Sequence, residues 1–176
     1  MLANVGKVPN AQQVADRIAI GEVLALHSRG LDRVEESTLK SCYWSDAEVD
    51  YGTFVGSAHQ FAELVMQALA GTYELTRHCI GNTLIAFDGN DLANCESCVN
   101  ADHLFIGAKQ EMQFAGRYLD TLEKRDGVWK MKHRRVVIDW SRTVDVVDER
   151  GSEAFVAMAK GAHSEADPSH AHFSNN

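Results

Sequence analysis

Residues 76–106 read TRHCIGNTLIAFDGNDLANCESCVNADHLFI, two long stretches rich in β-branched and small residues on either side of DGND. Asp, Gly and Asn favour tight turns, so this stretch predicts an antiparallel hairpin. The pattern repeats downstream, where GAKQ and RDG separate further stretches of the same kind. The sequence therefore predicts a meander of four long strands, at 76–87, 92–106, 111–124 and 128–140.

Three amphipathic segments precede the meander. From Ala11 to about Leu31, apolar residues recur at three- and four-residue spacing, and Gly30 marks the expected end of a helix. Further helices are expected at 37–44 and from Ser57 to Gly71. Helices followed by a meander predict an α+β domain, a cone with three N-terminal helices packed on a strongly curved, mostly antiparallel sheet. If its inward residues are not all large and apolar, that cone is a pocket.

Composition excludes several classes of protein. A chain of 176 residues with 45% hydrophobic content suits one compact domain, expected at 1–142. The formal charge of -8 disfavours binding to nucleic acid or to an anionic membrane, and the basic run KMKHRR at 130–135 is short. No apolar run reaches the roughly 18 residues of a membrane span, and the N-terminus lacks the pattern of a signal peptide. The expected location is the cytoplasm.

Residues 143–176 form a C-terminal extension. SEAFVAMAKG at 152–161 predicts a last short helix over the mouth of the cone, and the end rich in Ser, His and Asn is expected to be disordered. The irregular spacing of the tail histidines disfavours a metal site. The single CESC has no second CxxC, so the cysteines are expected to be reduced thiols. The tail histidines are His163, His170 and His172, and the cysteines are Cys42, Cys79, Cys95 and Cys98.

His78 lies near the start of the first long strand. Because strands alternate faces, His78, Asn82 and Leu84 are expected to point into the same space. A buried histidine bonded to a backbone carbonyl would be the ordinary structural explanation. The functional alternative is a histidine that moves a proton.

Asp32 follows the first helix, where a solvated carboxylate would be unremarkable. Its functional interpretation is a carboxylate that holds one nitrogen of His78, fixes the tautomer and raises the basicity of the other nitrogen. His27 precedes Asp32 by five residues, about 140° apart on an ideal helix. The two converge only if the helix ends irregularly at Gly30.

Three stretches together resemble a known family: RIAIGEVLALHSRGLDRVEESTLKSCYWSDAEVDY at 17–51, TRHCIGNTLI at 76–85 and GRYLDTLEKRDGVWKMKHRRVVIDW at 116–140. They resemble the SnoaL-like branch of the nuclear transport factor 2-like superfamily. That branch includes scytalone dehydratases, bile-acid 7α-dehydratases, hexachlorocyclohexane dehydrochlorinases and lignin-dimer γ-formaldehyde lyases. The resemblance covers about residues 12–142, and its most specific features are the helix-ending Asp, the early strand His and RDGVWK.

The resemblance implies roles for single residues. His78 would be the general base and Asp32 its partner, while His27 stands where family members carry a pocket Tyr or Lys. Tyr51 stands where related dehydratases place a substrate-facing tyrosine; the residues alone explain it equally well as a packed aromatic.

For the basic pair Arg134 and Arg135 and for Asp102, the sequence allows either an inward-facing or an outward-facing side chain. Arg134 matches a pocket arginine of the dehydrochlorinases, whereas strict alternation from Trp129 would point Arg135 inward. Asp102 matches a second acidic pocket residue of the bile-acid enzymes, with an outward-facing charge as the alternative.

This set of residues predicts a cofactor-independent lyase, with no metal or organic cofactor. His78 would abstract a proton while a hydrophobic aromatic or steroid-like substrate expels water, halide or formaldehyde. An isomerase of the same fold and a non-catalytic protein that binds small molecules are the alternatives. The apolar run Val136, Val137 and Ile138 predicts burial on both faces of a strand, and hence a homodimer or homotrimer.

Overall fold

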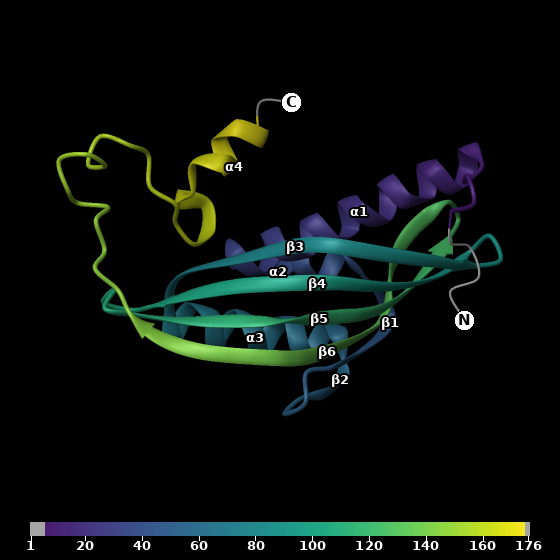
Figure 1. Cartoon of the computed structure of the whole chain (residues 1–176), viewed down its shortest axis with the longest axis horizontal. Coiled ribbons are helices and arrows are strands. Elements are labelled where there is room, and N and C mark those ends of the chain that lie inside the picture. Colours follow the sequence, from purple (N-terminus) through teal and green to yellow (C-terminus); the bar gives the residue numbers. More distant parts are fainter. Residues whose placement is uncertain (1–5, 175–176) are drawn as a thin grey trace.

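The computed structural model describes residues 6–174, which fold into helices packed against one curved sheet (Figure 1). The helices of this part are α1 (Ala11–Asp32), α2 (Glu36–Ser41), α3 (Ala58–Thr72) and α4 (Pro168–Phe173), with a 3-10 turn at Ser164–Ala166. The strands are β1 (Tyr43–Asp50), β2 (Val55–Ser57), β3 (Tyr73–Asp88), β4 (Leu92–Phe105), β5 (Gln110–Arg125) and β6 (Val128–Asp145).

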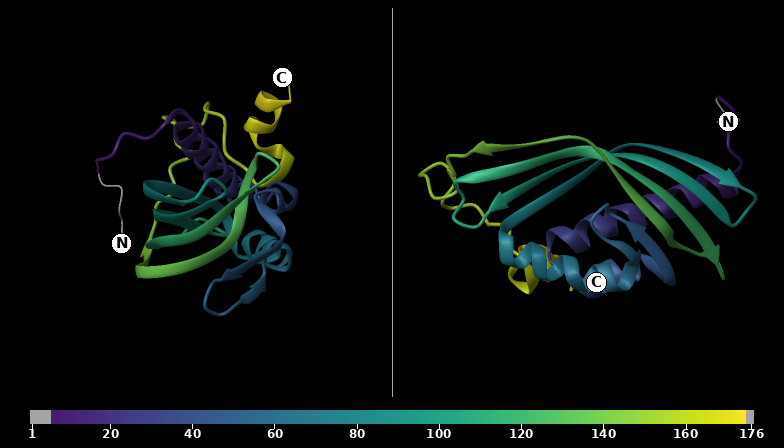
Figure 2. Two further views of the ribbon diagram at one scale, coloured as in Figure 1. Left: turned by 90° about the vertical axis from the view of Figure 1, so that its right-hand side faces the viewer. Right: turned by 90° about the horizontal axis from the view of Figure 1, so that it is seen from below.

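The sheet has the strand order β2-β1-β6-β5-β4-β3. Its neighbours are antiparallel except β1 and β6, which run parallel. The four predicted long strands are confirmed as β3 to β6, joined by tight turns. Figure 2 shows the sheet bending strongly, with α1 and α3 on its inner side. The predicted α+β cone is therefore the observed fold.

The second helix ends earlier than predicted, whereas the first ends next to the predicted Leu31. The second helix, expected over 37–44, stops at Ser41, because Tyr43 enters β1 beside Met131 of β6 and the Cys42 carbonyl accepts from the Met131 amide. The first helix passes Gly30 and stays regular to Asp32. Beyond it, Val34 takes a left-handed φ of 54°, and the Glu35 amide donates back to the Gly30 carbonyl. This backbone pattern ends helices where the chain must turn sharply.

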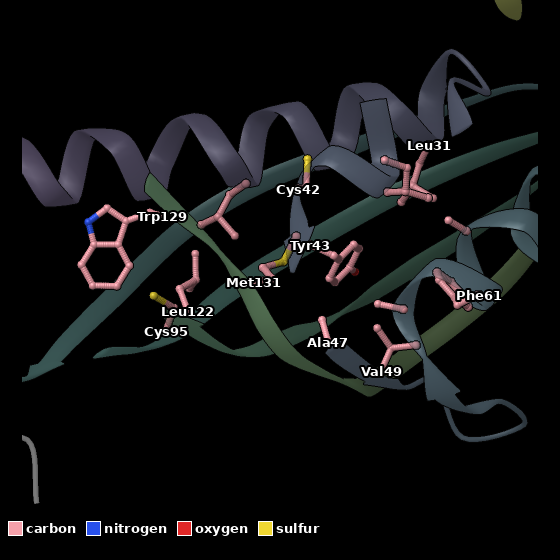
Figure 3. Close-up of a cluster of buried hydrophobic side chains, with 14 of the residues drawn as sticks. Leu31, Cys42, Tyr43, Ala47, Val49, Phe61, Cys95, Leu122, Trp129 and Met131 are labelled. Atoms are coloured by element: carbon pink, nitrogen blue, oxygen red, sulfur yellow. The ribbon is translucent and has the colours of Figure 1, made fainter. Parts of the chain in front are cut away.

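The core lies between the inner face of the sheet and the helices (Figure 3). Trp129 lies toward one side of this cluster and Phe61 toward the other, with Met131 and Tyr43 between them, and Leu122 also belongs to it. Each of these side chains is at most 6% exposed. Burying one such side chain contributes about 1.5–3 kcal/mol, so this cluster stabilises the packing of the helices on the sheet.

Two β-bulges change which residues face the core. The pairing of β3 with β4 shifts between Ile80 and Thr83. On β6, Met131 pairs with Leu122 and His133 with Thr121, which leaves Lys132 as an extra residue. An extra residue reverses the in-and-out alternation beyond it.

The C-terminal extension differs from the prediction. Residues 150–158 form turns in place of the expected helix, and Figure 1 shows this segment running beyond the end of the sheet before α4 returns to α1. Asp167 caps α4 and Pro168 starts it, a combination that favours a helix start there. Within the segment expected to be disordered, Ser164–Ala166 form the 3-10 turn and Pro168–Phe173 form α4.

The apolar residues of β6 from which an oligomer is predicted are only partly buried in the single chain. In the single chain Val136 and Val137 are half-buried and Ile138 is 58% exposed. The homodimer or homotrimer stays a prediction that light scattering can test. Among residues 6–174, no helix is long and apolar enough to cross a membrane.

Gly30 allows α1 and α2 to pack closely, which makes a stability prediction. A Cβ at Gly30 would lie 2.9 Å from the Leu39 backbone nitrogen, whereas one at Gly21 of the same helix would meet nothing within 4 Å. We expect Gly30→Ala to lower the free energy of unfolding by about 1–3 kcal/mol. Gly21→Ala, the matched control, should raise it by about 0.5–1 kcal/mol. Equal effects in urea denaturation would contradict this account of Gly30.

Candidate functional site

His78 and Asp32 form a tight pair inside the cone. His78 Nδ1 lies 2.7 Å from Asp32 Oδ1, and the two side chains are 8% and 11% exposed. Asp32 also accepts from the Thr76 hydroxyl at 3.0 Å and from the His78 backbone amide at 2.9 Å. Because the carboxylate accepts at Nδ1, the proton of a neutral imidazole stays there and Nε2 carries the free lone pair. The predicted contact between His78 and Asp32 is therefore present.

The end of α1 explains this geometry. Asp32 is the last helical residue, and the turn through Val34 fixes the direction in which its side chain leaves the helix. Asp32 thus reaches across to Thr76 and His78, two inward neighbours on β3. Thr76 had not been assigned a role from the sequence, because its hydroxyl matters only through this carboxylate.

A second polar cluster lies deeper, around Arg134. The Arg134 guanidinium pairs with both carboxylate oxygens of Asp120 at 2.7 Å, and neither side chain is exposed. Arg134 Nη1 also contacts the His27 ring at 2.9 Å, and the guanidinium stacks 3.8 Å above Tyr118. The His27 ring Nε2 lies 2.9 Å from the Tyr43 hydroxyl. The cluster is a buried cation held by a carboxylate and aromatic rings.

The charges of this cluster follow from burial and pairing. Burial alone would lower the pKa of Arg134, but the Asp120 carboxylate raises it well above its ordinary value. Burial and the nearby Arg134 lower the pKa of His27 well below its ordinary value, so His27 is neutral. Burial raises the pKa of Tyr43 well above the ordinary value, so its hydroxyl keeps its proton. The cluster offers fixed donors to an incoming group.

Tyr51 brings a further hydroxyl to the cluster around Arg134. Its ring stacks on Phe61 with centroids 3.9 Å apart, and burial raises its pKa. Its buried oxygen makes no hydrogen bond of good geometry within the described residues, although Arg134 and Tyr43 lie close enough to offset part of the effect of burial on its pKa. A buried hydroxyl without a partner is costly unless a ligand completes it.

His103 is a pocket residue to which the sequence gave no role. Its ring packs edge-on against His78 with centroids 5.2 Å apart, and its buried Nδ1 has no hydrogen-bond partner among residues 6–174. Burial, together with His78, lowers the pKa of His103 to about 4. His103 pairs with Thr76 across β3 and β4. Extending the inward and outward alternation of the β3 side chains to β4 would therefore have predicted that His103 points inward.

Three predicted pocket residues lie elsewhere. Asn82 is exposed because the bulge after Ile80 reverses the alternation of β3, which also turns Leu84 outward. Asp102 lies on the outer face and pairs with Arg77. Arg135 is 61% exposed and pairs with Asp50, because the extra residue Lys132 turns Arg134 inward in its place.

The inner face between the two polar groups carries small or apolar residues. The sheet register places Ala101 and Phe114 beside His78, and Val99 and Gly116 in the next row toward Arg134. A Cβ at Gly116 would fall within 2.7 Å of the Phe114 ring, so the glycine allows the ring to lie over it. Small residues flanked by a few convergent polar groups are typical of pockets for apolar ligands. Within the described residues, no three His, Cys, Asp or Glu side chains are grouped to hold a metal ion.

Comparison with known proteins gives the family. The model of the SnoaL-like domain matches residues 12–135. Hexachlorocyclohexane dehydrochlorinase 1 of Sphingobium indicum is 30% identical over 122 residues, which is 68% of this chain and 79% of that protein. An uncharacterized protein of Mycobacterium tuberculosis is 24% identical over 110 residues, covering 61% and 74% of the two chains.

Solved structures agree with this match. A type 2 hexachlorocyclohexane dehydrochlorinase superposes with a TM-score of 0.71 at 25% identity, covering 77% of this chain and 93% of the other. A scytalone dehydratase-like protein of Novosphingobium aromaticivorans superposes with a TM-score of 0.68 at 23% identity, covering 88% and 95%. At 23% identity, the match to the scytalone dehydratase-like protein supports only a shared fold.

The Arg134–Asp120 pair makes a stability prediction. Asp120→Asn leaves a fully buried guanidinium without its counter-charge, and we expect the free energy of unfolding to fall by about 3–5 kcal/mol. Asp102→Asn is the control, because its partner Arg77 is 73% exposed and the loss should stay below about 1 kcal/mol. Urea denaturation measures both, and a small loss in Asp120→Asn would refute the role assigned to the pair.

His103 predicts a pH dependence of stability. The unfolded chain protonates this histidine near the ordinary histidine pKa of 6.5, whereas in the folded chain its pKa is lowered to about 4. Below pH 6.5 the unfolded state therefore binds more protons, and stability falls by at most about 1.4 kcal/mol per pH unit until pH 4. His103→Asn should flatten this decline between pH 7 and 5, whereas His172→Asn, exposed on α4, should not. An unchanged slope in His103→Asn would show that the buried imidazole does not cause it.

Proposed function

The chain belongs to the SnoaL-like domain family, and from this membership and its His–Asp pair we propose that it is a cofactor-independent lyase. The observation that carries the proposal is the His78 Nδ1–Asp32 Oδ1 distance of 2.7 Å in a nearly closed interior. Such a pair keeps Nε2 free of its proton, with the lone pair available to a substrate. The names of the dehydrochlorinase relatives favour elimination as the reaction.

In the elimination, His78 Nε2 removes a proton from a carbon atom of the substrate. The C–H electron pair becomes the new C=C bond, and the leaving group departs from the adjacent carbon as chloride or, with a proton, as water. In the formaldehyde variant His78 instead removes a hydroxyl proton. The O–H electrons then form the carbonyl of formaldehyde, and the broken C–C bond supplies the electrons that become the C=C bond as a further group leaves. In each case Asp32 stabilises the imidazolium that forms.

The polar cluster around Arg134 supports the departing group. Arg134 and the Tyr51 hydroxyl are donors whose positions are fixed before the substrate arrives, Arg134 by Asp120 and Tyr51 by its stacking on Phe61. Preorganised donors stabilise negative charge as it develops, because they need no rearrangement. We assign Tyr51 and Arg134 to the leaving group, neutral His27 to the support of Arg134, and His103 to hydrogen bonding with the substrate.

The inner face limits the class of substrate. Its small and apolar residues beside His78, Ala101, Val99 and Phe114, suit a hydrophobic ring compound. We propose a chlorinated alicyclic, aromatic or steroid-like substrate. Asn82, Asp102 and Arg135 take no part in it, since they face outward.

An isomerase remains the alternative that the same base permits, because a protonated His78 can return its proton to another carbon. Both reactions begin with the same abstraction. They differ in whether the product loses mass.

Mass spectrometry of candidate substrates distinguishes the reactions. Purified protein treated with a chelator would be incubated with chlorinated cyclohexanes, hydroxylated steroids and aromatic diols. Loss of hydrogen chloride, water or formaldehyde would support the lyase, while a rearranged product of unchanged mass would select the isomerase. Binding without any conversion across the whole panel would contradict both and leave a binding protein.

His78 and Asp32 make the sharpest prediction about activity. We expect His78→Ala to lower kcat by at least about a hundredfold, the usual contribution of a general base. Asp32→Asn should also lower kcat, because an amide can donate to Nδ1 and so favour the wrong tautomer. His172→Ala is the control for the loss of an exposed histidine. A His78→Ala variant that stays folded by circular dichroism and keeps its kcat would remove His78 from the mechanism.

A further inference from the structure

The C-terminal extension returns to the end of α1 that carries Asp32. The Ser164 amide donates to the Arg33 carbonyl at 2.7 Å, and Arg33 Nε lies 3.3 Å from Asp167 Oδ2. Farther along, Arg29 donates to the Ser169 hydroxyl at 2.9 Å. The segment 161–170, which we call the C-terminal clasp, is therefore attached to the residue that directly follows the dyad carboxylate.

Asp167 holds the clasp in shape. It is 5% exposed and accepts from the Ala162 amide, the Ser169 amide and the Ser169 hydroxyl. Burial alone would raise the pKa of Asp167, but these hydrogen bonds and Arg33 lower it to about 2. A buried carboxylate with this many donors is a fixed structural centre, unlike a residue of a loose tail.

The backbone is strained on both sides of the contact. Ser164 has a φ of 66° and Val34 a φ of 54°, both in the left-handed region. A β-branched residue rarely adopts this conformation, and the surrounding contacts must hold it. The strain marks a specific junction between the clasp and α1.

The clasp also borders the dyad from the solvent side. Gly161 lines a hollow of about 330 Å³ together with Asp32 and Thr76, and the outward-facing Arg77 and Asp102 form part of its other wall. His163 directly precedes Ser164, whose amide donates to the Arg33 carbonyl, and the buried His163 Nε2 has no hydrogen-bond partner among the described residues. Burial and Arg33 lower the pKa of His163, and Asp32 opposes this effect. The clasp thus lies against the end of α1 that carries Asp32.

We propose that the C-terminal clasp completes the active site, with His163 as a positioning residue that, together with the clasp backbone, keeps solvent from the Asp32–His78 pair. Interactions between a carboxylate and an imidazole weaken steeply when water enters. The clasp lies outside the matched family range of 12–135, so it is a feature of this chain beyond the family domain. The inference rests on the proposed function only for the catalytic role of Asp32.

The His78 Nδ1 proton reports on this seal without any substrate. In a 2.7 Å bond to Asp32 it should give a downfield proton resonance that is visible only while protected from exchange with water. The full-length chain would be compared with His163→Ala, Asp167→Ala and His163→Gln. Glu165→Gln is the matched control, since Glu165 is an exposed side chain of the same clasp. Exchange of the His78 amide, which donates to Asp32, gives a second signal.

We expect the resonance in the wild type and in Glu165→Gln, and its loss in His163→Ala and Asp167→Ala. The His78 amide should exchange at least about tenfold faster in these two variants. His163→Gln, which keeps a polar group near the position of Nε2, should recover part of the protection. Where a substrate has been found, kcat should fall about tenfold with KM nearly unchanged, because the dyad and not the binding face is affected.

The outcomes separate this inference from the proposed function. Protection that depends on His163, beside a protein that converts no substrate, supports the clasp and contradicts the lyase. A wild type without the protected proton, or a His163→Ala variant indistinguishable from Glu165→Gln, overturns the clasp even if the lyase is found. If Asp167→Ala loses helix content by circular dichroism, the two His163 variants decide.

Discussion

The Asp32 carboxylate joins three separate parts of the chain. It belongs to the last turn of α1, it accepts hydrogen bonds from Thr76 and from both the ring and the amide of His78 on β3, and the C-terminal clasp docks beside it through Arg33. A buried carboxylate needs such donors, because an anion without them could not remain charged inside the fold. The same contacts that satisfy the charge therefore fix the tautomer of His78.

The Arg134–Asp120 pair plays a complementary part in the interior of the cone. A buried cation is tolerated there because a carboxylate, an aromatic face and a neutral histidine surround it. Between this cation and the dyad lie small residues such as Val99 and Gly116. The interior thus places a base at one side and fixed donors at the other, with small and apolar residues between them.

Two single-residue bulges decide which side chains take part. On β6 the extra residue Lys132 turns Arg134 inward and leaves Arg135 to pair with Asp50 on the surface. On β3 the shift after Ile80 leaves His78 inside but moves Asn82 out. A bulge costs little in pairing, yet it reverses every position beyond it, so the site depends on the register of the sheet as much as on residue types.

The sequence by itself determined the helices, the meander of four strands and the α+β cone, because apolar periodicity and turn residues are local signals that burial then enforces. It also indicated His78, Asp32, His27, Tyr51 and Arg134 as candidates, helped by a family resemblance. Only the tertiary structure decided that Arg134 and not Arg135 faces inward, that Asn82 and Asp102 face outward, and that His103 and Thr76 lie at the dyad. It alone brought the clasp to Asp32. Bulges, sheet register and contacts between residues more than 100 positions apart arise from packing, which no local pattern encodes.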